Sequence, residues 1–502
     1  MKALLQKRDK IFYLAGLLFL VGCAARLVAL TSLPNGLNQD EAYAGYNAWC
    51  ILHYGVDSAG YRNPVYLNAW GSGMNVLETY LMIPFMALLG PTTLAIRLPQ
   101  ALVACLSLFC IYDLGKRTLG RGFGLCALAV LATSPWHVMM SRWALESNLA
   151  PGFLLFGLYF FVRGMSSPKW LYASAAAYGL GLYAYATIWP IMPVILVLQG
   201  VYALRVKSVR VRNLIGPALL VLALAIPLLL FLAVQMDFLP EVRTAFLSIP
   251  KLEKFRGGDL SLSRIPENIR RVALILLQQR DNAPWNYHSV MGLYYPFWLL
   301  PFAIGLGAVC VRTVRCLRER KSGFEGLVLI NLLAGGLQCC VILVNVNRMN
   351  AVHIPILLCV AYGVYTICAG VRAQLRRQVR VAVAATYALC FMLFIGMYAS
   401  SYNDVISTTF RAGLREALDH AQSVRGSTPM HISDEGYGSQ IYFFLEKPPL
   451  EELPDDITIG DLSDLPEGAV YVGTAEEVAE LAGQGYELTR FDEWAVALPS
   501  PQ

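Results

Sequence analysis

The stretch "VLETYLMIPFMALLG" at residues 76–90 decides the fold, because its placement fixes the side of the membrane on which every later loop lies. A helix needs about 20 predominantly apolar residues to cross a bilayer. This stretch is shorter, carries Glu78 and is interrupted by Pro84. It therefore either crosses the membrane or lies along its surface, and the charges of the neighbouring loops must decide between the two.

Lysine and arginine concentrate in the cytoplasmic loops of membrane proteins. Here the N-terminal "KALLQKRDK" is basic, and so are the loops at residues 115–121, 163–169, 204–212, 312–321 and 371–380. If residues 76–90 do not cross, all five loops share the side of the N-terminus. We therefore predict that residues 76–90 lie on the outer membrane surface as an amphipathic helix.

The composition predicts a polytopic α-helical membrane protein, since 56% of the 502 residues are hydrophobic and the mean hydropathy is +0.51. Eleven transmembrane helices are expected, at residues 11–30, 96–114, 122–140, 147–164, 169–187, 188–205, 213–236, 291–313, 324–345, 351–371 and 380–400. The first segment ends in Leu-Val-Gly-Cys at Cys23, as a lipoprotein signal would. Because its apolar run continues to Leu30, we expect an uncleaved anchor.

The charge divides the chain into two parts. Residues 1–400 carry a net charge near +20, whereas residues 401–502 carry 19 acidic and 5 basic residues. We expect a transmembrane domain over residues 1–400, with residues 31–95 as its first external loop, and a small external α/β domain over residues 401–502. The apolar body has no phosphate-binding GxxxxGK[ST] motif, and neither a nucleic-acid partner nor a disulfide or structural zinc framework is expected.

An acidic pair, Asp40 and Glu41, opens the first external loop in "LNQDEAYAGYNAW" at residues 37–49. Several arginines lie on the same side, where the positive-inside rule does not expect them, namely Arg26, Arg97, Arg142 and Arg348. Charges near the hydrocarbon are costly unless they are paired or used. This side of the membrane is therefore predicted to hold the functional site.

Each of these charges allows two interpretations. Arg142 and Glu146 are four residues apart, and they form either a rim ion pair or a pair that faces the same outer cavity as Asp40. Arg348 is either a snorkelling anchor or a clamp for a lipid-linked phosphate, whose oxygens match a guanidinium fork. Asn38 or Asp40 also suits the N-cap of a short helix, which is compatible with a catalytic role.

Three further residues are predicted to contact substrate more weakly. Trp285 and Asn286 lie in "QQRDNAPWNYHS" at residues 278–289, where the aromatics form either an interfacial belt or a stacking surface for a sugar ring. His53 lies in the first external loop and is more typical of a structural histidine.

An outer site with a carboxylate, arginines and aromatics at membrane level suits a substrate with a lipid tail, a phosphate and a polar head, such as a polyprenyl-phosphate sugar. Transfer of that sugar needs a base for the attacking hydroxyl and charge stabilisation for the leaving phosphate. It does not need the two carboxylates that a glycosidase places across the bond.

The chain resembles the GT-C superfamily of membrane glycosyltransferases, in the branch of the protein O-mannosyltransferases and the aminoarabinose transferases. The resemblance covers roughly residues 8–400 and rests on "QDEAY", on "AIRLPQALVACLSLFCIYDLGKRTLGRGFGLCALAVLATSPWHVMMSR" and on "NVNRMNAVHIP". It implies that Asp40 is the catalytic base, that Glu41 supports it by hydrogen bonding or by fixing the loop, and that Glu146 matches a second acidic residue. Some relatives bind a divalent metal there, so Mg, Mn or Zn at Asp40 and Glu146 stays open.

We thus expect an inverting glycosyltransferase in the bacterial cytoplasmic membrane, with a cytoplasmic N-terminus and an external C-terminal domain. Its partners are membrane lipids, a polyprenyl-phosphate-linked sugar donor and a cell-envelope lipid, polymer or protein acceptor. A flippase for lipid-linked sugars is the alternative, although such transporters often show internal repeats and midplane charges. A scaffold with a partner-binding tail is the third.

Overall fold

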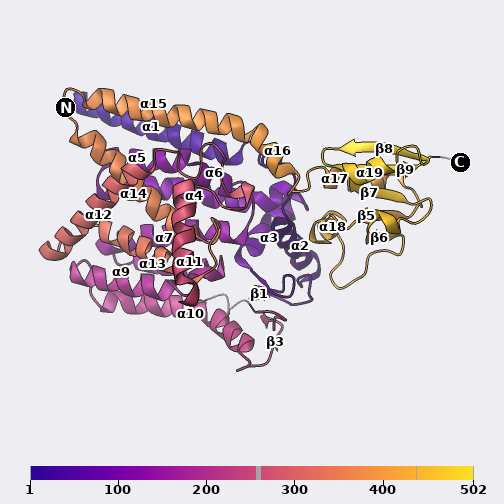
Figure 1. Ribbon diagram of the computed structural model, residues 1–502. Helices are drawn as coiled ribbons and strands as arrows, with labels where there is room; N and C mark the ends of the chain where they lie inside the picture. Colours follow the sequence, from indigo (N-terminus) through magenta and orange to yellow (C-terminus); the bar gives the residue numbers. More distant parts are fainter. Residues whose placement is uncertain (1, 256–261, 437, 501–502) are drawn as a thin grey trace.

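The computed structural model describes residues 2–255, 262–436 and 438–500 and has two parts (Figure 1). A large helical body is built from the apolar helices, and a small mixed sheet domain follows it at the C-terminal end. Helices α2 and α3 lie at the junction between the two parts. The predicted fold class, a polytopic helical protein with a small C-terminal α/β region, is confirmed.

The body is helical almost throughout. Its long helices are α1 (Lys2–Leu27), α4 (Thr93–Thr118), α7 (Glu146–Ser166), α10 (Arg212–Gln235), α12 (Leu299–Glu319), α14 (Asn350–Gly370) and α15 (Arg376–Tyr398). Its shorter helices are α2 (Gln39–Tyr54), α3 (Leu77–Leu89), α5 (Arg121–Thr133), α6 (Pro135–Met140), α8 (Trp170–Gly181), α9 (Met192–Arg205), α11 (Ile265–Gln278), α13 (Glu325–Val341) and α16 (Ser401–Ser407).

Within the described residues, seven helices are long and apolar enough to cross a membrane, and each matches one of the eleven predicted spans. The other four predicted spans are shorter or broken. The span expected at residues 122–140 splits into α5 and α6, because Ser134 caps a new helix that begins at Pro135. The span expected at residues 169–187 ends as helix α8 at Gly181, and the single-turn 3-10 helix η1 (Ala186–Ile188) follows.

Residues 76–90 form α3, as the sequence predicts. Its Leu77 N–H donates to the carbonyl oxygen of Tyr183 at 3.1 Å, which joins the start of α3 to the chain after α8. Met82 and Met86 are buried against α2 and α4, whereas Leu88 is 80% exposed. The helix therefore has one buried face, and its position along the outer membrane surface stays a prediction.

The C-terminal domain is a five-stranded sheet in the order β6-β5-β7-β9-β8. Its strands are β5 (Met430–Ser433), β6 (Ile457–Gly460), β7 (Val470–Thr474), β8 (Tyr486–Phe491) and β9 (Trp494–Pro499), and its helices are α17 (Leu414–Val424), α18 (Gly438–Phe444) and α19 (Ala475–Glu480). Strands β8 and β9 form an antiparallel hairpin, because Asp492 turns the chain between them at φ 49°.

Candidate active site

Asp40 lies in the first turn of α2, and the sequence around it explains why the helix begins there. The side chain of Asn38 accepts the N–H of Asp40 at 2.9 Å, and Glu41 Oε2 accepts the N–H of Asn38 at 2.9 Å. Together they form a capping box, which fixes the first turn of a helix. Asp40 is half-buried, so its carboxylate sits at a rigid and accessible helix start.

Glu41 points the other way, into the protein. Its carboxylate forms a two-pronged ion pair with Arg97, with Oε1 at 2.8 Å from Nε and Oε2 at 3.0 Å from Nη2. The N–H of Ala144 also donates to Oε1 at 2.9 Å. Glu41 and Arg97 are both fully buried, which gives them a structural role in fixing the loop rather than contact with substrate.

Arg142 does not form the predicted pair with Glu146. Its guanidinium donates to the carbonyl oxygens of Leu33, Ala25, Val28 and Ala29 at 2.7–2.9 Å, and the side chain is buried. The expected spacing fails because α7 begins at Glu146, so Arg142 precedes the helix. Arg97 likewise donates to the carbonyls of Leu30, Pro34 and Gly36, so both arginines hold the chain that leads into α2.

Glu146 begins α7 and is half-buried, like Asp40. Its Oε2 accepts the backbone and side-chain N–H groups of Asn75, the latter at 2.8 Å. Tyr185, at the N-cap of η1, lies within electrostatic range of Glu146, Arg348 and Asp40, and its hydroxyl interacts with the Arg348 side chain. Tyr185 is thus a shared neighbour of Asp40, Glu146 and Arg348, which come from three other parts of the chain.

Glu78 lies behind this group, on the first turn of α3. It is buried, and neither carboxylate oxygen has a hydrogen-bond partner. Burial raises the pKa of Glu78 well above its ordinary value, and the nearby charges of Glu41 and Glu146 raise it further. Burial and these two carboxylates thus act in the same direction on Glu78, toward its neutral form.

Three predicted residues lie elsewhere. His53 is at the opposite end of α2, about 20 Å along the helix axis from Asp40, and its ring lies against Trp49, tilted by 43°, with ring centroids 5.2 Å apart. Trp285 packs against Phe410, and Asn286 Nδ2 donates to Asp281 at 3.1 Å. These contacts support the segment that carries Arg348, since Asp281 also accepts the N–H of Val346 at 2.9 Å.

Tyr185 and Asn75 are not predicted as site residues from the sequence. Glu78 entered the prediction only as evidence that residues 76–90 do not cross the membrane. Tyr185 lies inside an apolar run, so no charge marked it. Asn75 precedes α3 and acts mainly through a backbone N–H, which any residue carries. The charge of Glu78 in an apolar helix was the one available signal, because such a group is expensive unless it has a use.

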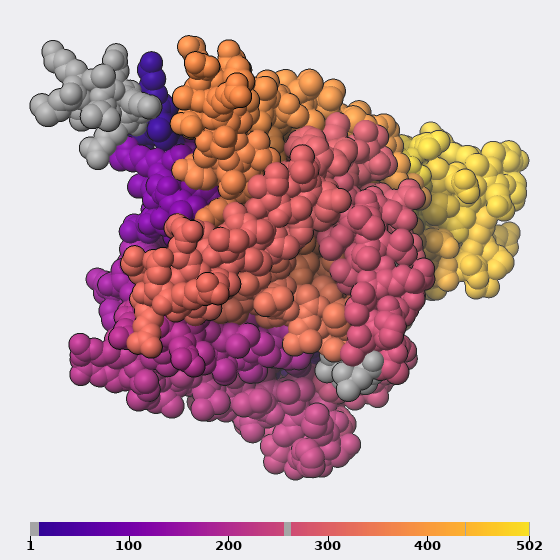
Figure 2. All heavy atoms as spheres, turned by 60° about the vertical axis from the view of Figure 1, so that its left-hand side comes forward, coloured from indigo at the N-terminus to yellow at the C-terminus, as the bar shows by residue number. Residues whose placement is uncertain are grey.

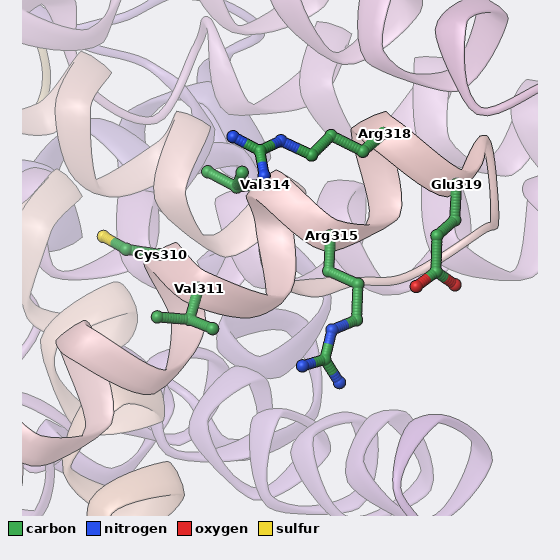
Figure 3. Close-up of a pocket in the computed structure, with 6 residues that line it drawn as sticks. All are labelled: Cys310, Val311, Val314, Arg315, Arg318 and Glu319. Carbon is green, nitrogen blue, oxygen red and sulfur yellow. The ribbon is translucent and has the colours of Figure 1, made fainter.

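No group of three or more His, Cys, Asp or Glu side chains that could hold a metal ion occurs in residues 2–255, 262–436 and 438–500. A surface depression of about 570 Å³ is lined by residues of α12, including Arg315 and Arg318. Figure 3 shows these side chains as sticks. None of the site residues belongs to α12, so this depression is separate from the site.

A second, apolar cavity of about 520 Å³ lies among α8, α9 and α10. Its side chains are apolar apart from Ser174. Leu182 and Trp189, which flank Tyr185 in the sequence, line it as well. This apolar space therefore approaches the chain segment that contributes Tyr185 to the candidate site.

Comparison with known proteins agrees with this architecture. Residues 76–234 match the family model for dolichyl-phosphate-mannose-protein mannosyltransferase. The crystal structure of ArnT from Cupriavidus metallidurans in the apo state is similar over 99% of this chain and 100% of that one, with a TM-score of 0.57 and 12% identity. The same protein bound to undecaprenyl phosphate is similar over 98% and 99% of the two chains, with a TM-score of 0.56 and 13% identity.

The archaeal oligosaccharyltransferase AglB from Archaeoglobus fulgidus, in complex with an inhibitory peptide and a dolichol-phosphate, is also similar. It matches over 96% of this chain and 73% of its own, with a TM-score of 0.52 and 13% identity. No curated protein matches the sequence. The structural likenesses show that this chain has the GT-C fold.

Proposed function

We propose that this membrane glycosyltransferase of the GT-C superfamily moves a sugar from a polyprenyl-phosphate-linked donor to a hydroxyl acceptor on the outer face of a bacterial cytoplasmic membrane. The GT-C fold and the family match over residues 76–234 support this class of enzyme. The observation that carries the proposal is the position of Asp40, half-buried on a capped helix start and grouped with Glu146, Tyr185 and Arg348.

In the proposed reaction, Asp40 accepts the proton of the acceptor hydroxyl while that oxygen attacks the anomeric carbon of the donor sugar. The bond between the anomeric carbon and the phosphate oxygen breaks, and polyprenyl phosphate leaves with the electron pair. Attack from the opposite face inverts the anomeric centre. Arg348 stabilises the charge that develops on the phosphate, and Tyr185 orients the Arg348 side chain.

The apolar cavity among α8, α9 and α10 supports a lipid-linked donor. Its volume of about 520 Å³ lies within the range of small-molecule sites, and its apolar lining suits an isoprenoid tail. The structure of ArnT holds undecaprenyl phosphate and that of AglB holds a dolichol-phosphate, which are carriers of the proposed chemical class. A divalent metal at Asp40 and Glu146 would need oxygens of the substrate to complete its coordination.

The test is the Asp40→Asn variant, which keeps the capping geometry and removes the base. Purified protein is incubated with a panel of labelled polyprenyl-phosphate sugars and membrane extract, and the labelled product is identified. We expect transfer to fall about 10²–10⁴-fold, with normal membrane insertion. Full activity of Asp40→Asn would remove the proposed base, and movement of the labelled lipid across vesicles without product would favour a flippase.

A further inference from the structure

The C-terminal domain bonds directly to the peptide that leads into Asp40. The N–H of Leu37 donates to the carbonyl oxygen of Phe410 at 2.6 Å, and the carbonyl oxygen of Leu37 accepts the side-chain amide of Gln440. Ser439 Oγ also donates to the carbonyl oxygen of Gln39 at 3.3 Å. Two of the three residues before Asp40, Leu37 and Gln39, are therefore held by a part of the chain about 400 residues away.

Buried apolar side chains from both parts also pack together at this junction. Helix α18 lies against α2 (Figure 1), and Phe443 of α18 is buried in one cluster with Leu37, Ala42 and Tyr46 of the α2 region. Gly36 has φ +79° and faces the Phe410 carbonyl so closely that a Cβ atom has no room. Figure 2 shows the C-terminal domain as a lobe on the flank of the body, so these contacts are its attachment.

The opposite side of the same turn is fixed by the body. Arg97 holds Glu41, and the N–H of Ala144 donates to Glu41 as well. Asp40 therefore lies between two sets of contacts, one from the body and one from the C-terminal domain. Loss of either set leaves the first turn of α2 free to shift.

We propose that Gln440 is a positioning residue for Asp40 and that the C-terminal domain is a structural part of the active site. This inference rests on the proposed function, in which Asp40 is the base. Gln440 is fully buried and donates to Leu37 through its side-chain amide. Without that donor the buried Leu37 carbonyl has no partner, so the peptide shifts to find one. A shift of about 1 Å at a reacting group lowers a rate on the order of 10²-fold.

The test variant is Gln440→Met, which keeps an unbranched side chain and removes the amide donor. Assays use the polyprenyl-phosphate sugar and membrane extract that give product with the wild type. We expect kcat to fall at least tenfold with little change in the donor KM, because the donor contacts stay intact. We also expect the pH profile of kcat to move, whereas a smaller folded fraction would lower activity without moving it.

Hydrogen exchange gives a readout that needs no substrate. In Gln440→Met we expect faster exchange in peptides that cover residues 37–45, with unchanged exchange in α4. The controls are Arg415→Gln, which removes a contact of the domain with the Pro91 carbonyl, and Gln484→Met, whose amide bonds only within its own turn. Both controls are expected to resemble the wild type.

Two results would overturn the inference. One is wild-type kcat and exchange in Gln440→Met, and the other is an equal loss in Arg415→Gln, which would assign the effect to docking of the whole domain. The Asp40→Asn variant separates this inference from the proposed function. If Asp40→Asn is active, both fail; if it is inactive while Gln440→Met behaves as wild type, only the inference fails.

Discussion

At the residue scale, buried arginines organise the site without taking part in it. Arg97 and Arg142 direct their guanidinium groups at backbone carbonyls between Ala25 and Gly36, where the chain leaves α1 and turns toward α2. Arg26 donates to the carbonyl oxygens of Gly22, Leu131 and Ala132. Buried carbonyl groups need partners, and a guanidinium offers five donors in one plane. Three of the four outward arginines are therefore braces for the backbone, and Arg348 is the one that we propose as a phosphate ligand.

The Arg97–Glu41 ion pair should matter strongly for stability. We expect Arg97→Met to lower the free energy of unfolding by about 3–5 kcal/mol, because it leaves the Glu41 carboxylate buried and unpaired. Thermal or denaturant unfolding in detergent measures the change. The matched control is Arg243→Met, since the Arg243–Glu241 pair is largely exposed and is expected to change stability by less than about 1 kcal/mol. Equal stability of Arg97→Met and the wild type would contradict the structural role.

At the element scale, helix starts decide where the functional groups lie. Asp40, Glu78 and Glu146 all lie in the first turns of α2, α3 and α7, where the sequence allows helices to be located. The sequence did not predict the direction in which each of these side chains points. Adjacent residues on a helix point about 100° apart, so Asp40 faces the site while Glu41 faces Arg97. Tyr185 was missed because a break after α8, rather than a charge, brings it to the site.

The turn after α2 should respond to pH through Asp57. Burial raises the pKa of Asp57 from 3.8 to about 6, although its Oδ1 accepts the N–H groups of Ala59 and Tyr61. Below pH 4 this carboxyl is protonated in both folded and unfolded chains. Between about pH 4 and 6 the folded protein keeps a proton that the unfolded chain has lost, so stability falls as the pH rises through this window.

The shift corresponds to about 3 kcal/mol of stability lost between pH 4 and 7. We expect Asp57→Asn to remove this component of the pH dependence. Unfolding midpoints at pH 5 and pH 7.5, compared between the variant and the wild type, isolate it from the other titrating groups. Parallel pH curves for the two proteins would show that Asp57 does not titrate as described.

At the scale of the whole molecule, the pattern of charge and apolar residues was enough for the fold class, and each of the eleven predicted segments contains a helix. It could not give their lengths. Ser134–Pro135 breaks one predicted span, and α8 is only 12 residues long, about 18 Å. These breaks depend on local capping and on tertiary contacts, which a hydropathy window averages away. The packing of α18 against α2 could not be predicted from the sequence either, because it joins residues 400 apart through buried, mostly uncharged groups.

The topology predicts that the C-terminal domain and the basic loops lie on opposite sides of the membrane. Asp455→Cys and Lys207→Cys place single exposed thiols in the domain and in the loop after α9. We expect a membrane-impermeant maleimide to label Asp455→Cys in spheroplasts. We expect it to label Lys207→Cys only after the spheroplasts are permeabilised. The wild type gives the background from its twelve native cysteines. Labelling of both variants from outside would contradict the eleven-span topology.

The hydrogen bond from the Gln440 side chain to the Leu37 carbonyl oxygen also has a consequence for biosynthesis. The two residues are 403 positions apart, so at about 5–20 residues per second the ribosome needs roughly 20 to 80 s to add the second after the first. During that interval the early helices are already in the membrane, but the turn that carries Asp40 lacks its outer contacts. A nascent or truncated chain is thus inserted into the membrane before it can catalyse transfer. The C-terminal part, which is made late, supplies the last hydrogen bonds to the residues that precede the first turn of α2.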